Sequence, residues 1–338
     1  MKAIILRGPR HAELASVKEP NAIGEEDVLL RVYNVGLCGS DLNSYRGRNP
    51  QVTYPRIPGH EIAATIVKAN PKYPAWPAGL AVTVSPYTNC GDCASCLRNC
   101  PNACQFNQTL GVQRDGALTE FMPMRVDRLY RSTLSLKDVC LVEPLTVGIH
   151  AVARARVAAG DTVAVLGCGG VGLGAVAGAA TRGATVIAVD VDEAKLELAH
   201  KAGAKYTING AHDDLHSQFL ELTAGRGPDV IVEAVGLPET FRAAVEEVAF
   251  SGRVVYIGYA KERVEYETRL FVQKELDILG SRNARPEDFR EAIRLLESRV
   301  FPMRDVVTHT VEMERAPHIL SAWDKAPAQF GKIIVDLS

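Results

Sequence analysis

The chain has 338 residues, of which 47% are hydrophobic and 23% are charged. This length is long for one hydrophobic core and favours two domains, each with enough apolar residues to bury its own core. The formal net charge of -2 argues against a nucleic-acid-binding footprint and against electrostatic attraction to a membrane surface.

The first part of the chain, up to about residue 150, contains short apolar runs broken by Pro and Gly. Such runs predict strands, and we expect them at 1–6, 27–32 and 81–84. The opening run therefore predicts a strand rather than a cleaved signal peptide. The run at 163–180 comes closest to a membrane span, but its glycines explain it better. The first domain is expected to be mostly β.

Four cysteines in one loop, Cys90, Cys93, Cys96 and Cys104, have the spacing C-x2-C-x2-C-x7-C. Four thiolates from so short a segment can complete a tetrahedral Zn²⁺ site with no open position, which is a structural site. Disulfides are the alternative, but they would be strained at this spacing, and the sequence has no secretory features. Cys100 lies outside the spacing. The eight cysteines, four of them expected metal ligands, fit a reducing cytoplasm.

From residue 161 onward, apolar strands alternate with helical patterns in the βαβ rhythm of a doubly wound parallel sheet. The expected strands are 162–166, 185–189, 230–232, 254–257 and 276–279, and the expected helices are 171–182, 193–202 and 238–250. A further helix is expected at 286–296, and a closing strand at 332–337 is expected to rejoin the first domain. The predicted domains are 1–152 and 153–285, with 286–338 returning to the first domain.

A glycine-rich motif follows the strand at 162–166 and opens a helix, formed by Gly167, Cys168, Gly169, Gly170, Val171 and Gly172. Here G-x-G-x-x-G would place a pyrophosphate against the helix N-terminus. Asp190, at the end of the next strand, can accept hydrogen bonds from the ribose hydroxyls and would repel a 2′-phosphate, which favours NAD over NADP. Asp192 is expected to be a helix cap, and Lys195 is a second candidate for the ribose. Val235, Ile257 and Ser281, near the ends of later strands, are candidates for contacts with the nicotinamide half.

A second set of metal-ligating residue types is spread over three segments of the first domain. These are Cys38-Gly39-Ser40-Asp41, Gly59-His60-Glu61 and Val142-Glu143-Pro144, and the Gly or Pro in each predicts a turn. Cys, His and carboxylate bind zinc with one position open in catalytic sites. Singly, each has an ordinary structural explanation, as a buried thiol, a core histidine or a surface carboxylate. Their occurrence beside a zinc loop and a dinucleotide motif favours a catalytic metal site.

Together these motifs resemble those of the zinc-dependent medium-chain dehydrogenases over nearly the whole chain. Within that family, the segment Glu143-Pro144-Leu145-Thr146-Val147-Gly148-Ile149-His150 is similar to the sorbitol dehydrogenase branch. The segments 45–50 and 280–284 resemble bacterial sugar-acid dehydrogenases that act on L-galactonate or L-gulonate, and Gly331-Lys332-Ile333-Ile334 is also typical of the family.

The resemblance implies an α/β protein with a GroES-like, mostly β catalytic domain and a Rossmann domain. It implies one structural zinc and one catalytic zinc, the latter held by Cys38, His60 and either Glu61 or Glu143, with the two carboxylates able to exchange places. Ser40 would take the proton of the substrate hydroxyl. Many relatives continue this relay with a histidine at the position of Asn43, so the exit of the proton differs here. The altered Gly79-Leu80-Ala81-Val82 is expected to affect packing only.

The expected reaction is oxidation of a secondary hydroxyl of a polyol or sugar acid by NAD⁺, with Arg282 and Asn283 at the substrate. The resemblance also implies a homodimer or homotetramer, and the net charge leads us to expect no nucleic-acid or membrane partner. The alternatives are a threonine-type zinc dehydrogenase, a metal-free NADPH reductase and a binding protein that uses its zinc loop. Cys38, His60 and Asp190 argue against the reductase, and Arg98 is the only positive side chain in the zinc loop.

Overall fold

The structure is a computed structural model that describes residues 1–20 and 23–338. It consists of two units: unit 1 is Met1–Glu143 with Met303–Ser338, and unit 2 is Pro144–Pro302. The chain therefore divides at Glu143 and Pro302, whereas the sequence led us to expect 152 and 285. Among the described residues, no helix has both the length and the apolar character that crossing a lipid bilayer requires.

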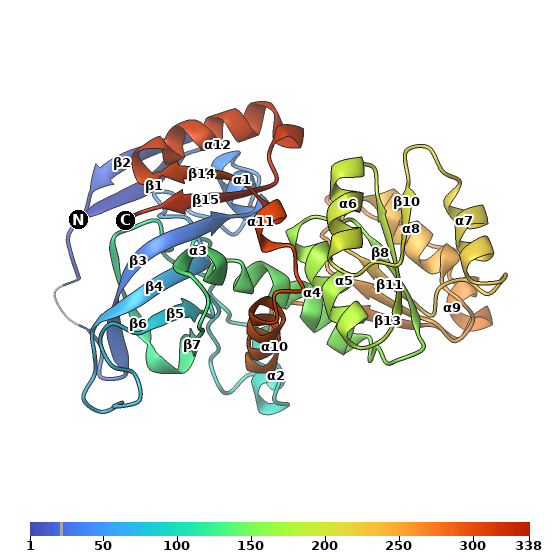
Figure 1. The fold of residues 1–338 in the computed structure, drawn as a ribbon, viewed down its shortest axis with the longest axis horizontal. Helices are drawn as coiled ribbons and strands as arrows, with labels where there is room; N and C mark the ends of the chain where they lie inside the picture. Colours follow the sequence, from blue (N-terminus) through green and yellow to red (C-terminus); the bar gives the residue numbers. More distant parts are fainter. Residues whose placement is uncertain (21–22) are drawn as a thin grey trace. The chain divides into compact units, whose positions relative to one another are not determined.

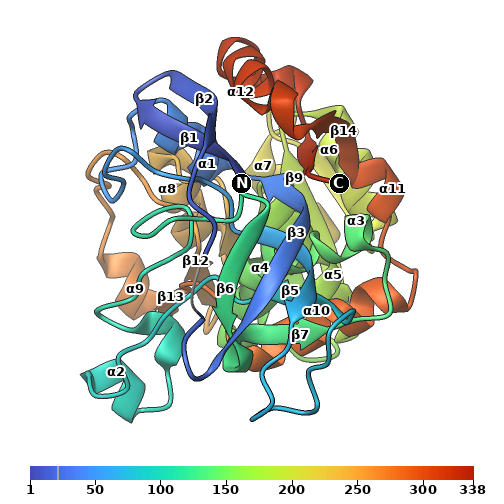
Figure 2. The same cartoon turned by 90° about the vertical axis from the view of Figure 1, so that its left-hand side faces the viewer.

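Unit 1 is built on a seven-stranded sheet in the order β14-β15-β3-β4-β5-β7, with β6 paired to β3, and a separate hairpin of β1 and β2 (Figures 1 and 2). The strands are β1 Lys2–Gly8, β2 His11–Ser16, β3 Asp27–Leu37, β4 Glu61–Lys68, β5 Ala81–Val84, β6 Phe121–Arg125, β7 Leu129–Arg131, β14 Val307–Glu312 and β15 Lys332–Asp336. Its helices are α1 Gly39–Tyr45, α2 Ala94–Leu97, α3 Leu136–Val139, α11 Met303–Val306 and α12 Ala316–Lys325.

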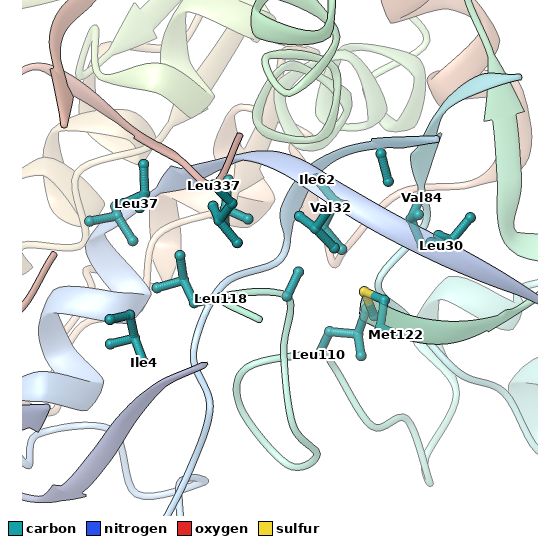
Figure 3. Close-up of a cluster of buried hydrophobic side chains, with 14 of the residues drawn as sticks. Ile4, Leu30, Val32, Leu37, Ile62, Val84, Leu110, Leu118, Met122 and Leu337 are labelled. Carbon is teal, nitrogen blue, oxygen red and sulfur yellow. The ribbon is translucent and has the colours of Figure 1, made fainter. Parts of the chain in front are cut away.

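The long strand β3 forms because its apolar residues alternate with polar or half-exposed ones. Val28, Leu30 and Val32 are fully buried, whereas Arg31 between them is exposed. This period of two turns one face of the strand to the core. Figure 3 shows Leu30 and Val32 in a cluster that also receives side chains from β1, β4 and the loop before β6.

The C-terminal strand β15 returns to the sheet of unit 1, as the sequence predicted. It pairs antiparallel with β3, so that Ile333 lies opposite Leu37 and Val335 opposite Val35. Figure 1 shows this strand beside β3, although almost the whole length of the chain separates them in sequence. The last residues therefore lie next to the segment that leads into α1.

Unit 2 is a parallel sheet in the order β10-β9-β8-β11-β12-β13. Its strands are β8 Thr162–Leu166, β9 Thr185–Asp190, β10 Tyr206–Asn209, β11 Val230–Glu233, β12 Arg253–Tyr256 and β13 Asp277–Gly280. Its helices are α5 Gly170–Thr181, α6 Glu193–Lys201, α7 Leu215–Leu222, α8 Pro238–Glu247, α9 Arg269–Gln273 and α10 Pro286–Glu297, and α4 Val142–Arg154 leads into the unit. Strand order reverses between β8 and β11, the type of switch point at which such sheets bind ligands.

Helix α10 belongs to unit 2 because its apolar face and one buried polar contact are both satisfied there. Phe289 and Leu296 are fully buried. Asp288 is buried as well, and its carboxylate lies 2.9 Å from Nδ1 of His150 on α4. The segment that returns to unit 1 therefore starts after this helix, at Met303.

Replacing Phe219 by Ala should destabilise unit 2. Phe219 on α7 is fully buried in the cluster that packs on the sheet. Its truncation leaves a cavity, and the expected loss is about 3–5 kcal/mol of unfolding free energy. Phe250 is 72% exposed, so Phe250→Ala serves as the control and should change stability by no more than about 0.5 kcal/mol. Urea unfolding measures both, and equal losses would contradict this packing.

Candidate metal and dinucleotide sites

The cysteine loop brings four sulfurs together at distances that fit one metal ion. Cys93 Sγ lies 3.5 Å from Cys96 Sγ and 3.8 Å from Cys104 Sγ, and Cys90 Sγ lies 3.7 Å from Cys104 Sγ and 4.0 Å from Cys96 Sγ. A sulfur tetrahedron around zinc, with Zn–S bonds of about 2.3 Å, has edges of about 3.8 Å. No disulfide joins any of the eight cysteines, all of which lie in the described part of the chain. The four thiols therefore fit a tetrahedral zinc ion.

Hydrogen bonds within the loop favour the thiolate of Cys93, whereas the Asp92 side chain raises the pKa of Cys90 and burial raises the pKa of Cys96. The backbone N–H groups of Cys93 and Phe106 donate to Cys90 Sγ and Cys104 Sγ, both at 3.3 Å. The Ser95 hydroxyl, 3.2 Å from Cys93 Sγ, is the main cause that lowers the pKa of Cys93 to about 5. Cys100 Sγ points instead to the Arg98 carbonyl, at 3.5 Å.

The second ligand set converges in unit 1 from three separate elements. Cys38 is the N-cap of α1, His60 immediately precedes β4, and Cys38 Sγ lies 3.1 Å from His60 Nε2. Glu61 begins β4, and ligand atoms of His60, Glu61 and Glu143 lie within 4.8 Å of one another. The exposed fractions of these three residues are 6%, 0% and 4%, so neither glutamate is a surface charge.

The turn expected around Glu143 is wrong. Glu143 lies in the first turn of α4, and Pro144 follows it in that same turn. Proline is tolerated there because the first backbone N–H groups of a helix have no partner within the helix. The first turn of α4 therefore places the Glu143 carboxylate in the metal-ligating cluster, as we had expected a turn to do.

Asp41 fixes the positions of the Cys38 and His60 segments. One of its carboxylate oxygens accepts from the Cys38 N–H at 3.0 Å, and the other accepts from the Gly59 N–H at 3.2 Å. The second oxygen also lies 3.8 Å from His60 Nδ1, a buried atom without a hydrogen-bond partner among the described residues. Burial lowers the pKa of His60, but Cys38 and Asp41 outweigh burial and raise it well above its usual value. This environment favours a cation.

Two further side chains contact the glutamates, and the sequence did not identify them as site residues. The Tyr87 hydroxyl donates to the Glu143 carboxylate, and burial raises the pKa of Glu143. The Lys332 ammonium donates to both carboxylate oxygens of Glu61, at 2.6 and 2.7 Å. The sequence indicated Lys332 only as part of a segment that is typical of the family, without a role in the site. Ser40 Oγ lies 2.9 Å from Cys38 Sγ, at the edge of the cluster.

The glycine-rich turn in unit 2 has the geometry that a dinucleotide motif requires. Gly167 has φ of 92°, in the left-handed region that favours glycine. A Cβ at Gly172 would lie 1.8 Å from the Gly167 carbonyl oxygen, so only glycine lets the helix pack this closely. A Cβ at Gly169 would have no atom within 4 Å. The turn leads directly into α5, beginning at Gly170 and Val171, so the helix N-terminus faces an open approach.

Asp190 links this turn to the end of β9. One carboxylate oxygen accepts from the Cys168 N–H at 2.8 Å, and the other accepts from the Val191 N–H at 2.9 Å. Lys195 Nζ lies 3.8 Å from that second oxygen. Asp192 caps α6, as the sequence predicted, by accepting from the Ala194 N–H at 2.9 Å.

Other expected ligand contacts lie where β11, β12 and β13 end. Val235 is 44% exposed and Ile257 is half-buried. Ser281 is buried, and its hydroxyl has no hydrogen-bond partner among the described residues. Arg282 and Asn283, both half-buried, follow it.

Glu233 organises the same edge of the sheet, although no sequence motif indicated this residue. It is fully buried at the end of β11, and one carboxylate oxygen accepts from the N–H groups of Val235 and Gly236, at 2.8 and 2.7 Å. The Thr240 hydroxyl donates to the same oxygen at 2.8 Å. The carboxylate thus holds the loop between β11 and α8.

Two family models match the chain in the order of its units. The alcohol dehydrogenase GroES-like domain matches residues 24–133, and the zinc-binding dehydrogenase model matches residues 170–298.

Relatives of similar length show the same family. A zinc-type alcohol dehydrogenase-like protein of Haemophilus influenzae is 33% identical, over 98% of both chains. Sorbitol dehydrogenase of Bacillus subtilis is 33% identical over 93% of this chain and 91% of its own. L-galactonate-5-dehydrogenase of Escherichia coli is 30% identical over 85% of this chain and 84% of its own.

Solved structures agree over the full length of the chain. The Escherichia coli alcohol dehydrogenase RspB, complexed with NADH, has a TM-score of 0.91 and 27% identity, covering 100% of this chain and 99% of its own. A Sinorhizobium meliloti protein bound to NADP has a TM-score of 0.92 and 28% identity, covering 99% of both chains.

Sheet topology, motifs and relatives thus agree on one assignment. The chain combines a GroES-like domain with a Rossmann domain. It belongs to the zinc-type medium-chain dehydrogenases, in their sorbitol dehydrogenase-like branch.

Proposed function

We propose that this protein is a zinc- and NAD-dependent dehydrogenase that oxidises a secondary hydroxyl of a polyol or sugar acid to a ketone. The cluster of Cys38, His60, Glu61 and Glu143 carries this proposal, because a thiol, an imidazole and carboxylates are the ligand types of catalytic zinc. The substrate class is supported by relatives named sorbitol, L-galactonate and erythritol/L-threitol dehydrogenases.

When bound, the zinc ion would supply a Lewis acid that acidifies the substrate hydroxyl, and the nicotinamide ring would accept hydride. The residues of the chain hold these groups in position and accept the proton that the substrate hydroxyl loses. Ser40, whose hydroxyl lies beside Cys38 Sγ, is the proposed proton acceptor. Asp41 keeps the Cys38 and His60 segments in place, and His60, Glu61 and Glu143 are buried, which limits the access of water to these three side chains.

The general test of this function is a panel of substrates. Polyols, aldonates, aldoses and threonine are each incubated with NAD⁺ and with NADP⁺, and absorbance of the reduced cofactor is followed. Turnover of a polyol or aldonate is expected. Turnover of threonine alone would contradict the proposed substrate class.

We predict two zinc ions per chain, one in the cysteine loop and one in the Cys38 cluster. Cys93→Ser should lower stability, because a structural zinc contributes directly to folding free energy. Cys38→Ser should keep the fold and the loop zinc but lose the other zinc and turnover. Cys100→Ser is the matched control in the same loop and should keep both metals. Elemental analysis measures the number of zinc ions per chain in each variant. An active Cys38→Ser protein with unchanged zinc content would contradict the catalytic assignment.

We predict a preference for NAD⁺ that depends on Asp190. Its carboxylate would accept from the ribose hydroxyls and would repel a 2′-phosphate as a like charge. Asp190→Ala should reduce kcat/KM for NAD⁺ on the order of tenfold to a hundredfold, the range for lost charged hydrogen bonds. The difference in kcat/KM between NAD⁺ and NADP⁺ should become smaller as a result. Asp192→Ala, which loses only a helix cap, is the control. Equal use of both cofactors by the wild type would refute this assignment.

We predict that Arg282 binds the carboxylate of a sugar acid. It follows β13 at the carboxyl edge of the parallel sheet, and its guanidinium can donate two parallel hydrogen bonds to a carboxylate. Arg282→Ala should lose on the order of 1.5–3 kcal/mol of transition-state binding with an aldonate and less with the matching polyol. Comparing kcat/KM for both substrates in the wild type and in Arg282→Ala tests this role. Equal losses of kcat/KM on both substrates would contradict it and favour neutral polyols as the substrate class.

A further inference from the structure

His150 ends the segment that is similar to the sorbitol dehydrogenase branch, but it has no part in the proposed reaction. It lies in the second half of α4 and is only 3% exposed. Its Nδ1 atom lies 2.9 Å from a carboxylate oxygen of Asp288 on α10, which is buried as well. An ionised carboxylate only accepts hydrogen bonds, so Nδ1 is the donor. This pair joins two helices of unit 2 that are far apart in the sequence.

The same oxygen of Asp288 fixes the end of the loop that follows β13. It accepts a hydrogen bond from the backbone N–H of Arg285, the N-cap of α10, at 2.7 Å. A side chain in the first turn that accepts from the N-cap N–H is one half of a capping box. Only residues 281–284, which include Arg282 and Asn283, lie between β13 and this cap. Asp288 therefore determines where this loop ends.

The beginning of the loop is supported from the same helix. Arg154 lies four residues after His150 on α4, so the two side chains project from one face of the helix. The Nε atom of Arg154 donates to the carbonyl of Gly280, the last residue of β13, at 3.3 Å. Helix α4 thus contacts the strand end before the loop and, through Asp288, the helix start after it.

Helix α4 is itself held close to α5, the helix that follows the glycine-rich turn. A Cβ at Gly148 would lie 2.2 Å from the Val171 carbonyl oxygen and 2.3 Å from the Ala175 nitrogen. A Cβ at Gly174 on α5 would lie 2.4 Å from the Leu145 carbonyl oxygen. Glycine at both positions therefore permits the close approach of the two backbones. Packed in this way, α4 can serve as a fixed support for the loop.

We propose that the His150–Asp288 pair positions the loop 281–284, so that Arg282 is presented to the carboxylate of a sugar acid. Without the imidazole, the buried Asp288 carboxylate loses a hydrogen-bond donor, and the end of the loop loses its link to α4. His150 is therefore a positioning residue that acts through Arg282. This inference rests on the proposed function, since it requires a sugar-acid substrate.

The test compares His150→Ala with His150→Asn. The side-chain amide of Asn can keep an N–H donor near the position of Nδ1, whereas Ala cannot. For each variant, kcat/KM is measured with an aldonate and with the matching polyol. His150→Ala should lower the aldonate-to-polyol ratio of kcat/KM by about twofold to tenfold, the range for one hydrogen bond, and His150→Asn should restore most of it. Partial unfolding alone would lower both activities equally and leave the ratio unchanged.

A double variant shows whether His150 acts through Arg282. In the Arg282→Ala protein, adding His150→Ala should not change the aldonate-to-polyol ratio, because the loop no longer carries the guanidinium. His200→Ala is the matched control, since it removes another histidine of unit 2, whose Nδ1 lies 3.0 Å from the Ala204 carbonyl oxygen. The control should keep the wild-type ratio. Equal reductions of the ratio by His150→Ala with and without Arg282 would overturn the inference.

Amide hydrogen exchange adds a readout that does not depend on turnover. In His150→Ala, the peptide that covers 281–288 should exchange about fivefold faster, the factor for one net hydrogen bond, while the amides of β8 keep the wild-type rate. Unchanged exchange of this peptide, or an unchanged substrate ratio, in folded His150→Ala would overturn the inference alone. A wild-type protein that oxidises neither polyols nor aldonates would instead contradict the proposed function itself.

Discussion

The register of three neighbouring strands, β15, β3 and β4, is the constraint on which the metal site depends. Gly36 of β3 lies between Glu61 of β4 and Ile334 of β15. Because side chains alternate along a strand, a slip of one residue would turn Glu61 to the opposite face and separate it from Lys332. The buried alternation of β3 opposes such a slip, since it would also expose Leu30 and Val32. Hydrophobic burial thus fixes the geometry of a polar site.

Burial also gives the charges of this site their effect. In a low-dielectric interior, each carboxylate needs a cation or a hydrogen-bond donor, and each ammonium needs a counter-ion. Asp41 has backbone N–H donors, Glu143 has Tyr87 and Glu61 has Lys332. The raised pKa of His60 shows that the surplus of negative charge favours a positive charge between these groups. A divalent metal ion would supply it.

Unit 2 uses buried carboxylates differently, to shape loops. Asp190 accepts from backbone N–H groups on both the glycine-rich turn and the end of β9, while Glu233 holds the loop after β11. Both residues end strands of the parallel sheet, at the edge where ligands bind in this fold. Asp190 would therefore have two roles, one in the conformation of the turn and one toward a ribose. The hydrogen bonds by which Asp190 stabilises the glycine-rich turn also hold its own carboxylate in position.

The sequence by itself determined the features whose members lie close together along the chain. The spacing of the cysteine loop, the glycine-rich motif with Asp190 and most of the βαβ rhythm are set by neighbours a few residues apart, so local patterns predict them. The short edge strand β10, the helix at Glu143 and the division at Pro302 were not predicted, since tertiary packing decides them. Lys332 shows the reason most clearly: it lies 271 residues from Glu61 in sequence, and only strand pairing brings the two charges into contact.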